Sequence, residues 1–371
     1  MWAALGVVIL LLAVGDWDGA VGTERHQAVQ AQAGGTAAAA AATVDKADYD
    51  ARMLALANLP PPPKPKPTPV AKAGKTARHG RGSAGVETPA VAKTAVRRPS
   101  RWPVHTVYPL AGAVLPFHRV VAYYGNFYST QMGILGQYPQ AEVLTRLQAV
   151  EEEWAKADPS TPVMPALDYI AVSAQASPGK DGKYRLRMPD DQLTKALAMA
   201  NAAHGLLFLD VQPGWSSLRD ELPRLEPFMK LPNVELALDP EFALVAGRRP
   251  GAWRGTMNAS EINYAIEWLA GVVKANHLAP KILVVHRFTQ AMVTGYKEIR
   301  PLPEVQIVMD MDGFGLPSNK TEAYHDYLNK EPVQFTGFKL FYHNDVKWGK
   351  RLMTPAEIMA LSPRPIFIVY Q

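Results

Sequence analysis

Short apolar runs that end in polar residues alternate with amphipathic helical patterns from about residue 102 to the end of the chain. Unbroken apolar runs separated by helices are typical of parallel strands that are covered on both faces. Eight such runs occur, at residues 120–126, 163–171, 206–212, 234–241, 282–287, 305–312, 337–343 and 365–371. Eight strand–helix units in a chain of this length predict an α/β fold, a single (β/α)8 barrel of the TIM type over residues 102–371.

The segments between the runs carry helix signals. Pro139 and Pro189 are each expected in the first turn of a helix, and Ser260 is expected to cap a third helix. The competing arrangement is an open doubly wound sheet, which usually has a glycine-rich turn after its first strand to hold a nucleotide phosphate. Residues 123–128 instead read Tyr-Tyr-Gly-Asn-Phe-Tyr. The barrel is therefore favoured, and a nucleotide cofactor is not expected.

Two further segments precede the barrel. Residues 1–22 contain an apolar stretch followed by small residues, and we expect a signal peptide or an N-terminal anchor there. Residues 23–101 are rich in Ala, Pro and Lys, and we expect a disordered, extended linker. The protein is accordingly expected to be secreted, periplasmic or associated with the cell envelope, with the N-terminal segment as its anchor.

Charge and composition exclude several classes of protein. The formal net charge is +5, and residues 64–101 contain ten Lys and Arg against one acid, Glu87. This basic stretch lacks aromatic residues for base stacking, so we expect a solvated spacer and no nucleic acid partner. If the stretch has a partner, an anionic envelope polymer or membrane surface fits its charge better. The chain has no cysteine, which excludes disulfides, thiol nucleophiles and thiolate metal sites. Carboxylates and imidazoles remain as the candidate chemistry.

Carboxylates gather at the polar ends of the apolar runs, and barrel active sites lie at the carboxyl ends of the strands. Side chains alternate along a strand, so Asp239 and Glu241 should share one face, as should Asp310 and Asp312. Mutual repulsion and desolvation should raise the pKa of at least one of these groups, which creates a general acid at neutral pH. We therefore predict that these four residues are catalytic.

Other polar and aromatic residues at the same ends are expected to bind substrate. An aspartate after a strand often caps a helix, and an indole often packs, so each residue also has a simpler structural role. The coincidence across several strands favours the functional role. The predicted substrate-binding residues are Asp168, Asp210, Tyr124, Asn126, Trp215, His286, Tyr342 and Gln371.

Asp239-Pro-Glu241 at the end of the fourth strand resembles the end of the fourth-strand motif of the family 18 chitinases. That resemblance implies that Glu241 is the acid and that Asp239 supports it. The segment from Met309 to Gly313 is loosely similar to the sixth-strand segment of that family, whereas Ala237 stands where the motif has a further Asp. More broadly, residues 119–371 resemble an exported bacterial barrel family of uncharacterised activity, which supports the barrel.

These observations favour a secreted or envelope-associated glycoside hydrolase-like enzyme that acts on a cell-envelope or extracellular glycan by carboxylate acid/base catalysis. We expect no cofactor. One alternative is a metal-dependent hydrolase of phosphoesters that holds a divalent ion through Asp239, Glu241, Asp310 and His286. A second alternative is a barrel that binds a glycan or cell-wall polymer without catalysis.

Overall fold

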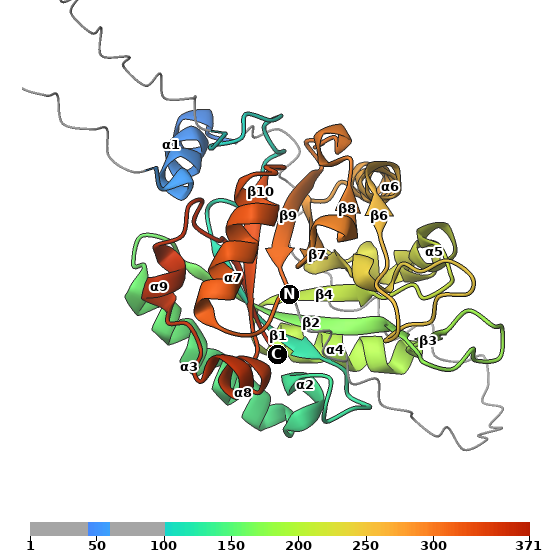
Figure 1. The fold of residues 1–371 in the computed structure, drawn as a ribbon. Helices are drawn as coiled ribbons and strands as arrows, with labels where there is room; N and C mark the ends of the chain where they lie inside the picture. The colour runs from blue at the N-terminus through green and yellow to red at the C-terminus, as the bar shows by residue number, and fades with distance from the viewer. Residues whose placement is uncertain (1–43, 60–100) are drawn as a thin grey trace, which may run out of the picture.

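The computed structural model of the protein describes residues 44–59 and 101–371 (Figure 1). The expected signal peptide or anchor at 1–22 and most of the expected linker lie outside the described residues. Among the described helices, none is both long enough and apolar enough to span a membrane.

Eight parallel strands close into a barrel, which confirms the predicted fold class. The strand order is β1-β11-β10-β9-β7-β5-β4-β2, and β1 pairs with both β2 and β11, so the sheet has no free edge between them. The strands are β1 (Arg119–Gly125), β2 (Val163–Ala174), β4 (Leu206–Val211), β5 (Val234–Leu238), β7 (Lys281–Arg287), β9 (Val305–Met311), β10 (Phe335–Leu340) and β11 (Phe367–Tyr370).

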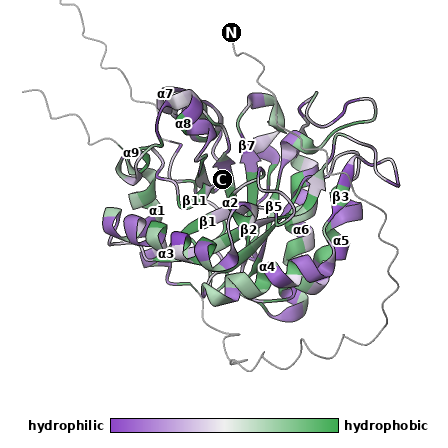
Figure 2. Cartoon of the chain, turned by 90° about the horizontal axis from the view of Figure 1, so that it is seen from below, coloured by the Kyte–Doolittle hydropathy of each residue, from purple (hydrophilic) through white to green (hydrophobic). Residues whose placement is uncertain are grey.

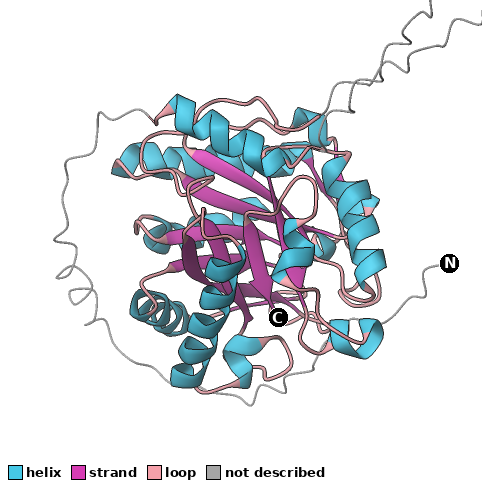
Figure 3. Cartoon of the chain, turned by 90° about the vertical axis from the view of Figure 1, so that its left-hand side faces the viewer, coloured by secondary structure: helices cyan, strands magenta, loops and turns pink. Residues whose placement is uncertain are grey.

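Helices surround the strands on the outside of the barrel (Figure 3). Pro139 and Pro189 are the N-cap residues of α3 and α4, one position before the expected first turn. Asn258, and not Ser260, caps α6, because its side chain accepts hydrogen bonds from the backbone of Ser260 and Glu261. The helices are α2 (Ile134–Gln137), α3 (Gln140–Ala157), α4 (Asp190–Ala202), α5 (Leu218–Met229), α6 (Ala259–Asn276), α7 (Pro317–Tyr324), α8 (Asn344–Gly349) and α9 (Pro355–Met359).

Short elements complete the loops. β3 (Arg185–Arg187) pairs antiparallel with β2, and β6 (Met257–Asn258) pairs with β8 (Val293–Thr294). The 3₁₀ helices are η1 (Pro240–Phe242), η2 (Gln290–Met292) and η3 (Tyr296–Glu298), and α7 continues into the π-helical turn η4 (His325–Asn329).

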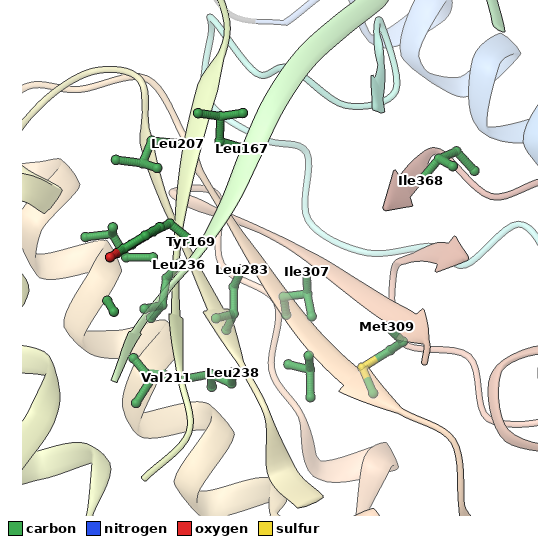
Figure 4. Close-up of a cluster of buried hydrophobic side chains, with 14 of the residues drawn as sticks. Leu167, Tyr169, Leu207, Val211, Leu236, Leu238, Leu283, Ile307, Met309 and Ile368 are labelled. Atoms are coloured by element: carbon green, nitrogen blue, oxygen red, sulfur yellow. The ribbon is translucent and has the colours of Figure 1, made fainter. Parts of the chain in front are cut away.

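The two faces of the strands belong to two separate apolar clusters, because successive side chains point to opposite sides of a strand. Leu167, Leu207 and Leu283 face outward and pack against the helices (Figure 4). Ala166, Phe208 and Val284 alternate with them and fill the barrel interior. Figure 2 shows the matching arrangement, with hydrophobic strands inside and hydrophilic colour on the helices around them. Alternate positions along a strand therefore place their side chains either against a helix or inside the barrel.

The helix α1 (Lys46–Ala57) lies within the segment that we expected to be a disordered linker, and the structure corrects that expectation for these residues. Asp45 caps the helix through the backbone of Ala47 and Asp48. Tyr49 and Met53 are buried in the interior cluster, beside residues at the amino ends of the strands. The reason is that the average composition of residues 23–101 is that of a linker, although this range includes one short amphipathic segment.

The end of α1 is fixed to the loop before β11. The Asn58 side chain donates to the carbonyl of Leu361 at 2.8 Å, and the Ser362 hydroxyl donates to the carbonyl of Ala57 at 2.8 Å. The backbone N–H of Arg364 donates to the carbonyl of Leu56 at 2.7 Å. α1 therefore belongs to the folded domain and closes the barrel at the end opposite to the carboxyl ends of the strands.

Candidate active site

Ionisable side chains from five strands meet inside the barrel near the carboxyl ends of the strands. Their positions continue the interior-facing register, so each lies beyond an apolar layer. They are Asp168 on β2, Asp210 on β4, His286 on β7, Asp310 on β9 and Lys339 on β10, all 0–2 % exposed. Asp239 and Asp312 follow β5 and β9 directly and are 2 % and 7 % exposed. The structure thus brings together five aspartates named from the sequence.

His286 lies among three of these aspartates. Its Nδ1 is 3.0 Å from Asp310 Oδ2, and the two atoms share a hydrogen bond. Nδ1 is also 3.8 Å from Asp312 Oδ2, and Nε2 is 3.7 Å from Asp168 Oδ2. Burial lowers the pKa of His286, which favours the neutral ring. The sequence left open whether His286 orients a carboxylate or is a core histidine, and its contact with Asp310 favours the first.

Lys339 is the cation inside this group. Its Nζ is 3.2 Å from Asp312 Oδ1 and 3.3 Å from Oδ2, and it lies 3.7 Å from the centre of the Tyr124 ring. The charge of Asp312 and of the other aspartates raises the pKa of Lys339 against the opposing effect of burial. Lys339 therefore stays charged, and its positive charge chiefly balances the charge of Asp312.

A second chain of hydrogen bonds joins Asp239 to Asp210. The Tyr124 hydroxyl donates to Asp210 Oδ2 at 2.7 Å. The Gln212 side-chain amide donates to the Tyr124 hydroxyl at 3.0 Å and to Asp239 Oδ2 at 3.3 Å. The Gln212 side-chain oxygen accepts from the backbone N–H of Ala174 at 3.0 Å, which fixes the direction of the amide.

Glu241 lies at the mouth of the barrel, but not through the strand alternation that we used to place it. β5 ends at Leu238, and Glu241 belongs to the 3₁₀ helix η1. Its side chain is partly exposed, unlike the aspartates. Desolvation and then the charge of Asp312 raise the pKa of Glu241 to about 8, against the opposing charges of Lys339 and Arg254. At neutral pH Glu241 therefore holds its proton.

The aspartates also resist ionisation. Burial raises the pKa of Asp310 to about 7. Burial, with the charges of neighbouring carboxylates, raises the pKa of Asp168 and Asp239 well above the usual range and raises those of Asp210 and Asp312. This agrees with the prediction that crowding at the barrel mouth would raise at least one carboxyl pKa.

Two structural features hold the Lys339 and Asp310 positions. The buried pair Lys320–Asp345 has a separation of 2.5 Å, and Lys320 Nζ also donates to the carbonyl of Lys339 at 2.8 Å. A Cβ on Gly337, which lies on β10 beside Asp310, would come within 2.5 Å of Asp310 Oδ1. A glycine at this position therefore leaves the space that the Asp310 carboxylate occupies.

The remaining predicted substrate-binding residues are spread over different environments. Asn126 donates to the carbonyl of Ile170 at 3.0 Å and accepts from the backbone of Tyr128, so it holds the loop after β1. Trp215 Nε1 donates to the carbonyl of Arg248, and its ring packs on Tyr184. Neither side chain contacts the carboxylate group.

Tyr342 packs with Tyr123 and stacks on Tyr370 in the layer between strands and helices, so it also lies apart from the carboxylates. The backbone of Gln371 extends the β10–β11 pairing through Leu340 and Tyr342. The predicted set thus divides: Asp168, Asp210, Tyr124 and His286 join the central group, and Asn126, Trp215, Tyr342 and the backbone of Gln371 support neighbouring structure.

Two members of the central group, Lys339 and Gln212, were not predicted as site residues. Lys339 stands in the run Gly-Phe-Lys-Leu-Phe, where a lysine inside an apolar strand was the available signal. Gln212 gave no comparable signal, because its role depends on the position of Tyr124 on another strand.

The metal-ligand set that we weighed from the sequence differs from the one that the fold assembles. Among the described residues, Asp168, Asp210 and His286 have candidate ligand atoms that all lie within 4.8 Å of one another. Asp310 contributes instead as the hydrogen-bond partner of His286.

No family model matches the chain, and no curated protein matches it. Among solved structures, the chain is similar to a hyperthermophilic endo-β-1,4-glucanase, with 9 % identity, 68 % of this chain and 88 % of that chain covered, and a TM-score of 0.36. It is similar to a Bacillus subtilis mannanase, with 10 % identity, coverages of 72 % and 88 %, and a TM-score of 0.37. It is also similar to a Burkholderia cenocepacia dihydropteroate synthase, with 8 % identity, coverages of 69 % and 86 %, and a TM-score of 0.32. Likenesses this distant carry no argument about activity, and the fold rests on the strand pairing described above.

Proposed function

We propose that the protein is a glycoside hydrolase that acts on a cell-envelope or extracellular glycan, with Glu241 as general acid and Asp312 as the second carboxylate. The observation that carries this proposal is the contrast between two neighbouring carboxyl groups at the barrel mouth. Glu241 is partly exposed and keeps its proton, whereas Asp312 is paired with Lys339. Glycosidic bond cleavage needs a protonated carboxyl group beside an ionised one, and the charge of Lys339 favours the ionised form of Asp312 against the burial that raises its pKa.

The reaction needs only these two groups and water. Glu241 would give its proton to the glycosidic oxygen while the bond from that oxygen to the anomeric carbon breaks, so the leaving sugar departs as a neutral alcohol. Asp312 would stabilise the developing positive charge, either by attacking the anomeric carbon or by taking a proton from the attacking water. Asp310 is less suitable for this role because it is fully buried and bonded to His286.

Aromatic side chains and the N-terminal sequence support a glycan substrate in the cell envelope. Trp253 and Trp348 follow β5 and β10, on the side of the mouth, and are 56 % and 42 % exposed. Exposed indole faces are suited to stacking on sugar rings. The apolar leader and the Pro-Lys segment of the sequence favour export and a spacer that reaches into an envelope layer.

The proposal predicts that Glu241→Gln abolishes turnover of a responsive glycan by about 10²-fold or more while binding survives. The measurement is release of reducing ends from a panel of envelope polysaccharides by the full-length protein. The matched control is Glu235→Gln, since Glu235 lies on β5 at the opposite end of the strand and its side chain accepts from the backbone of Ile282. The control should retain turnover. Equal turnover of Glu241→Gln and wild type would contradict the assignment, and glycan binding without any hydrolysis would favour a binding barrel.

The same assignment predicts an alkaline limit to activity. Because Glu241 must be protonated and its pKa is about 8, turnover should fall as the pH rises through about 8. A pH profile of kcat/KM that stays level from pH 6 to pH 10 would exclude Glu241 as the acid.

A further inference from the structure

One part of the barrel interior has polar atoms that the protein itself leaves without partners. Asp168 comes from β2, Asp210 from β4 and His286 from β7, and all three side chains are 0 % exposed. Both carboxylate oxygens of Asp168, Oδ1 of Asp210 and Nε2 of His286 have no hydrogen-bond partner. Buried polar atoms are normally satisfied, so this group of orphaned acceptors requires an explanation.

Candidate ligand atoms of the three side chains lie close together. One candidate ligand atom from each residue lies within 4.8 Å of the other two. Nε2 of His286 is 3.7 Å from Asp168 Oδ2, which is too long for a hydrogen bond between them. Two ligands of one metal ion, each about 2.0–2.2 Å from it, are separated by about 3 to 4.4 Å, so the 3.7 Å spacing between His286 and Asp168 fits a shared ion.

The cation of the central group contacts a different carboxylate. The cation of the central group, Lys339, pairs with Asp312. Asp168, Asp210 and His286 therefore face one another without a cation in contact.

The other atoms of the three residues are already fixed. His286 Nδ1 lies 3.0 Å from Asp310 Oδ2, and in the tautomer in which Nδ1 donates to that carboxylate the lone pair of the ring is on Nε2. Tyr124 donates to Asp210 Oδ2 and leaves Oδ1 free. A carboxylate behind the distal nitrogen of a histidine is the usual support of a metal-ligating imidazole.

We propose that Asp168, Asp210 and His286 bind one divalent transition-metal ion, with Asp310 as the residue that orients His286. One imidazole nitrogen and two carboxylates suit Mn²⁺, Fe²⁺ or Zn²⁺ better than Ca²⁺ or Mg²⁺, which prefer oxygen ligands alone. The site goes beyond the proposed glycoside hydrolysis, which uses Glu241 and Asp312 and needs no metal.

The test uses the full-length protein after treatment with a chelator, titrated with ZnCl₂ by calorimetry and with CoCl₂ by visible absorption. Wild type should bind one buried equivalent, give a cobalt band in the visible region, and melt at a higher temperature with Zn²⁺ than without it. Asp168→Asn and His286→Gln should each lose that equivalent, the band and the thermal shift. Asp310→Asn should weaken binding by about 10- to 100-fold, as expected for a residue that orients a ligand.

Glu241→Gln is the matched control, because it changes a carboxyl group of the same barrel mouth outside the ligand set. Glu241→Gln should bind Zn²⁺ as wild type does, even if it no longer hydrolyses a glycan. Failure of the metal site and failure of the proposed function therefore give different results. Circular dichroism of the metal-free variants checks their fold, and Asp210→Asn replaces any variant that does not fold. Retention of the equivalent and the cobalt band by folded Asp168→Asn or Asp210→Asn would overturn the proposal, as would the lack of a bound equivalent in wild type.

Discussion

At the scale of single residues, Lys339 decides how the carboxylates of the barrel mouth differ from one another. Its Nζ contacts both oxygens of Asp312 and lies over the ring of Tyr124. Asp312 is therefore the carboxylate with a cation in contact, while Glu241 keeps a proton. Without this lysine Asp312 would have no cation in contact, and the division into acid and charged partner would be lost.

Lys339→Met should therefore lower the free energy of unfolding at pH 7 by about 3–5 kcal/mol, because it leaves a buried carboxylate without its counter-ion. Urea unfolding followed by circular dichroism measures the change. Lys347→Met, at an exposed position on α8, is the control and should change stability by less than about 0.5 kcal/mol. Asp312→Asn added to Lys339→Met should restore part of the loss, and strictly additive losses would contradict the pairing.

At the scale of elements, α1 shows that a helix outside the eight repeated units belongs to the barrel. It contributes Tyr49 and Met53 to the interior cluster and is fixed by backbone and side-chain hydrogen bonds to the loop before β11. Its role is to cover the amino ends of the strands, which would otherwise expose apolar interior residues to water.

Met53→Ala should consequently destabilise the protein by about 2–5 kcal/mol, the range for removal of a buried side chain of this size. Leu54→Ala on the next position of the same helix is the control, since Leu54 is 60 % exposed and should change stability by less than about 0.5 kcal/mol. Thermal unfolding of the full-length variants distinguishes the two. Equal melting temperatures for Met53→Ala and Leu54→Ala would show that α1 contributes no burial to the fold.

At the scale of the whole molecule, the barrel encloses more carboxyl groups than cations, and this imbalance makes stability depend on pH. The pKa of Glu241 is raised to about 8 and that of Glu235 to about 7, both chiefly by burial. A raised carboxyl pKa in the folded state means that folded protein holds protons which the unfolded chain has released. Stability from these groups is complete below about pH 4.5 and is lost as the pH rises through the folded values.

The free energy of unfolding should therefore fall as the pH rises from about 6.5 to about 8. His286 has a lowered pKa and acts in the opposite direction, but only below its usual value of about 6.5. Urea unfolding of chelator-treated protein at several pH values measures the slope, and Glu241→Gln should make it shallower. Stability that rises with pH over this window would contradict the protonated state assigned to the barrel mouth.

The sequence by itself determined the barrel and the face that carries the site. Unbroken apolar runs indicate strands that are buried on both faces. The polar residues at the carboxyl end of each run show which end of the barrel carries the site. It also placed Asp168, Asp210, Asp239, Asp310 and Asp312 at one mouth, because strand direction is the same in every unit. The pattern within each run, together with the number of runs, was sufficient for these conclusions.

The tertiary structure decided the contacts between strands. Whether His286 meets Asp310, whether Lys339 neutralises Asp312, and which carboxylates stay without a partner all depend on the stagger of neighbouring strands, which no single run encodes. The same holds for α1, whose burial depends on a loop about 300 residues away in the chain. The residues that make these contacts are far apart in the sequence and come together only when the barrel closes.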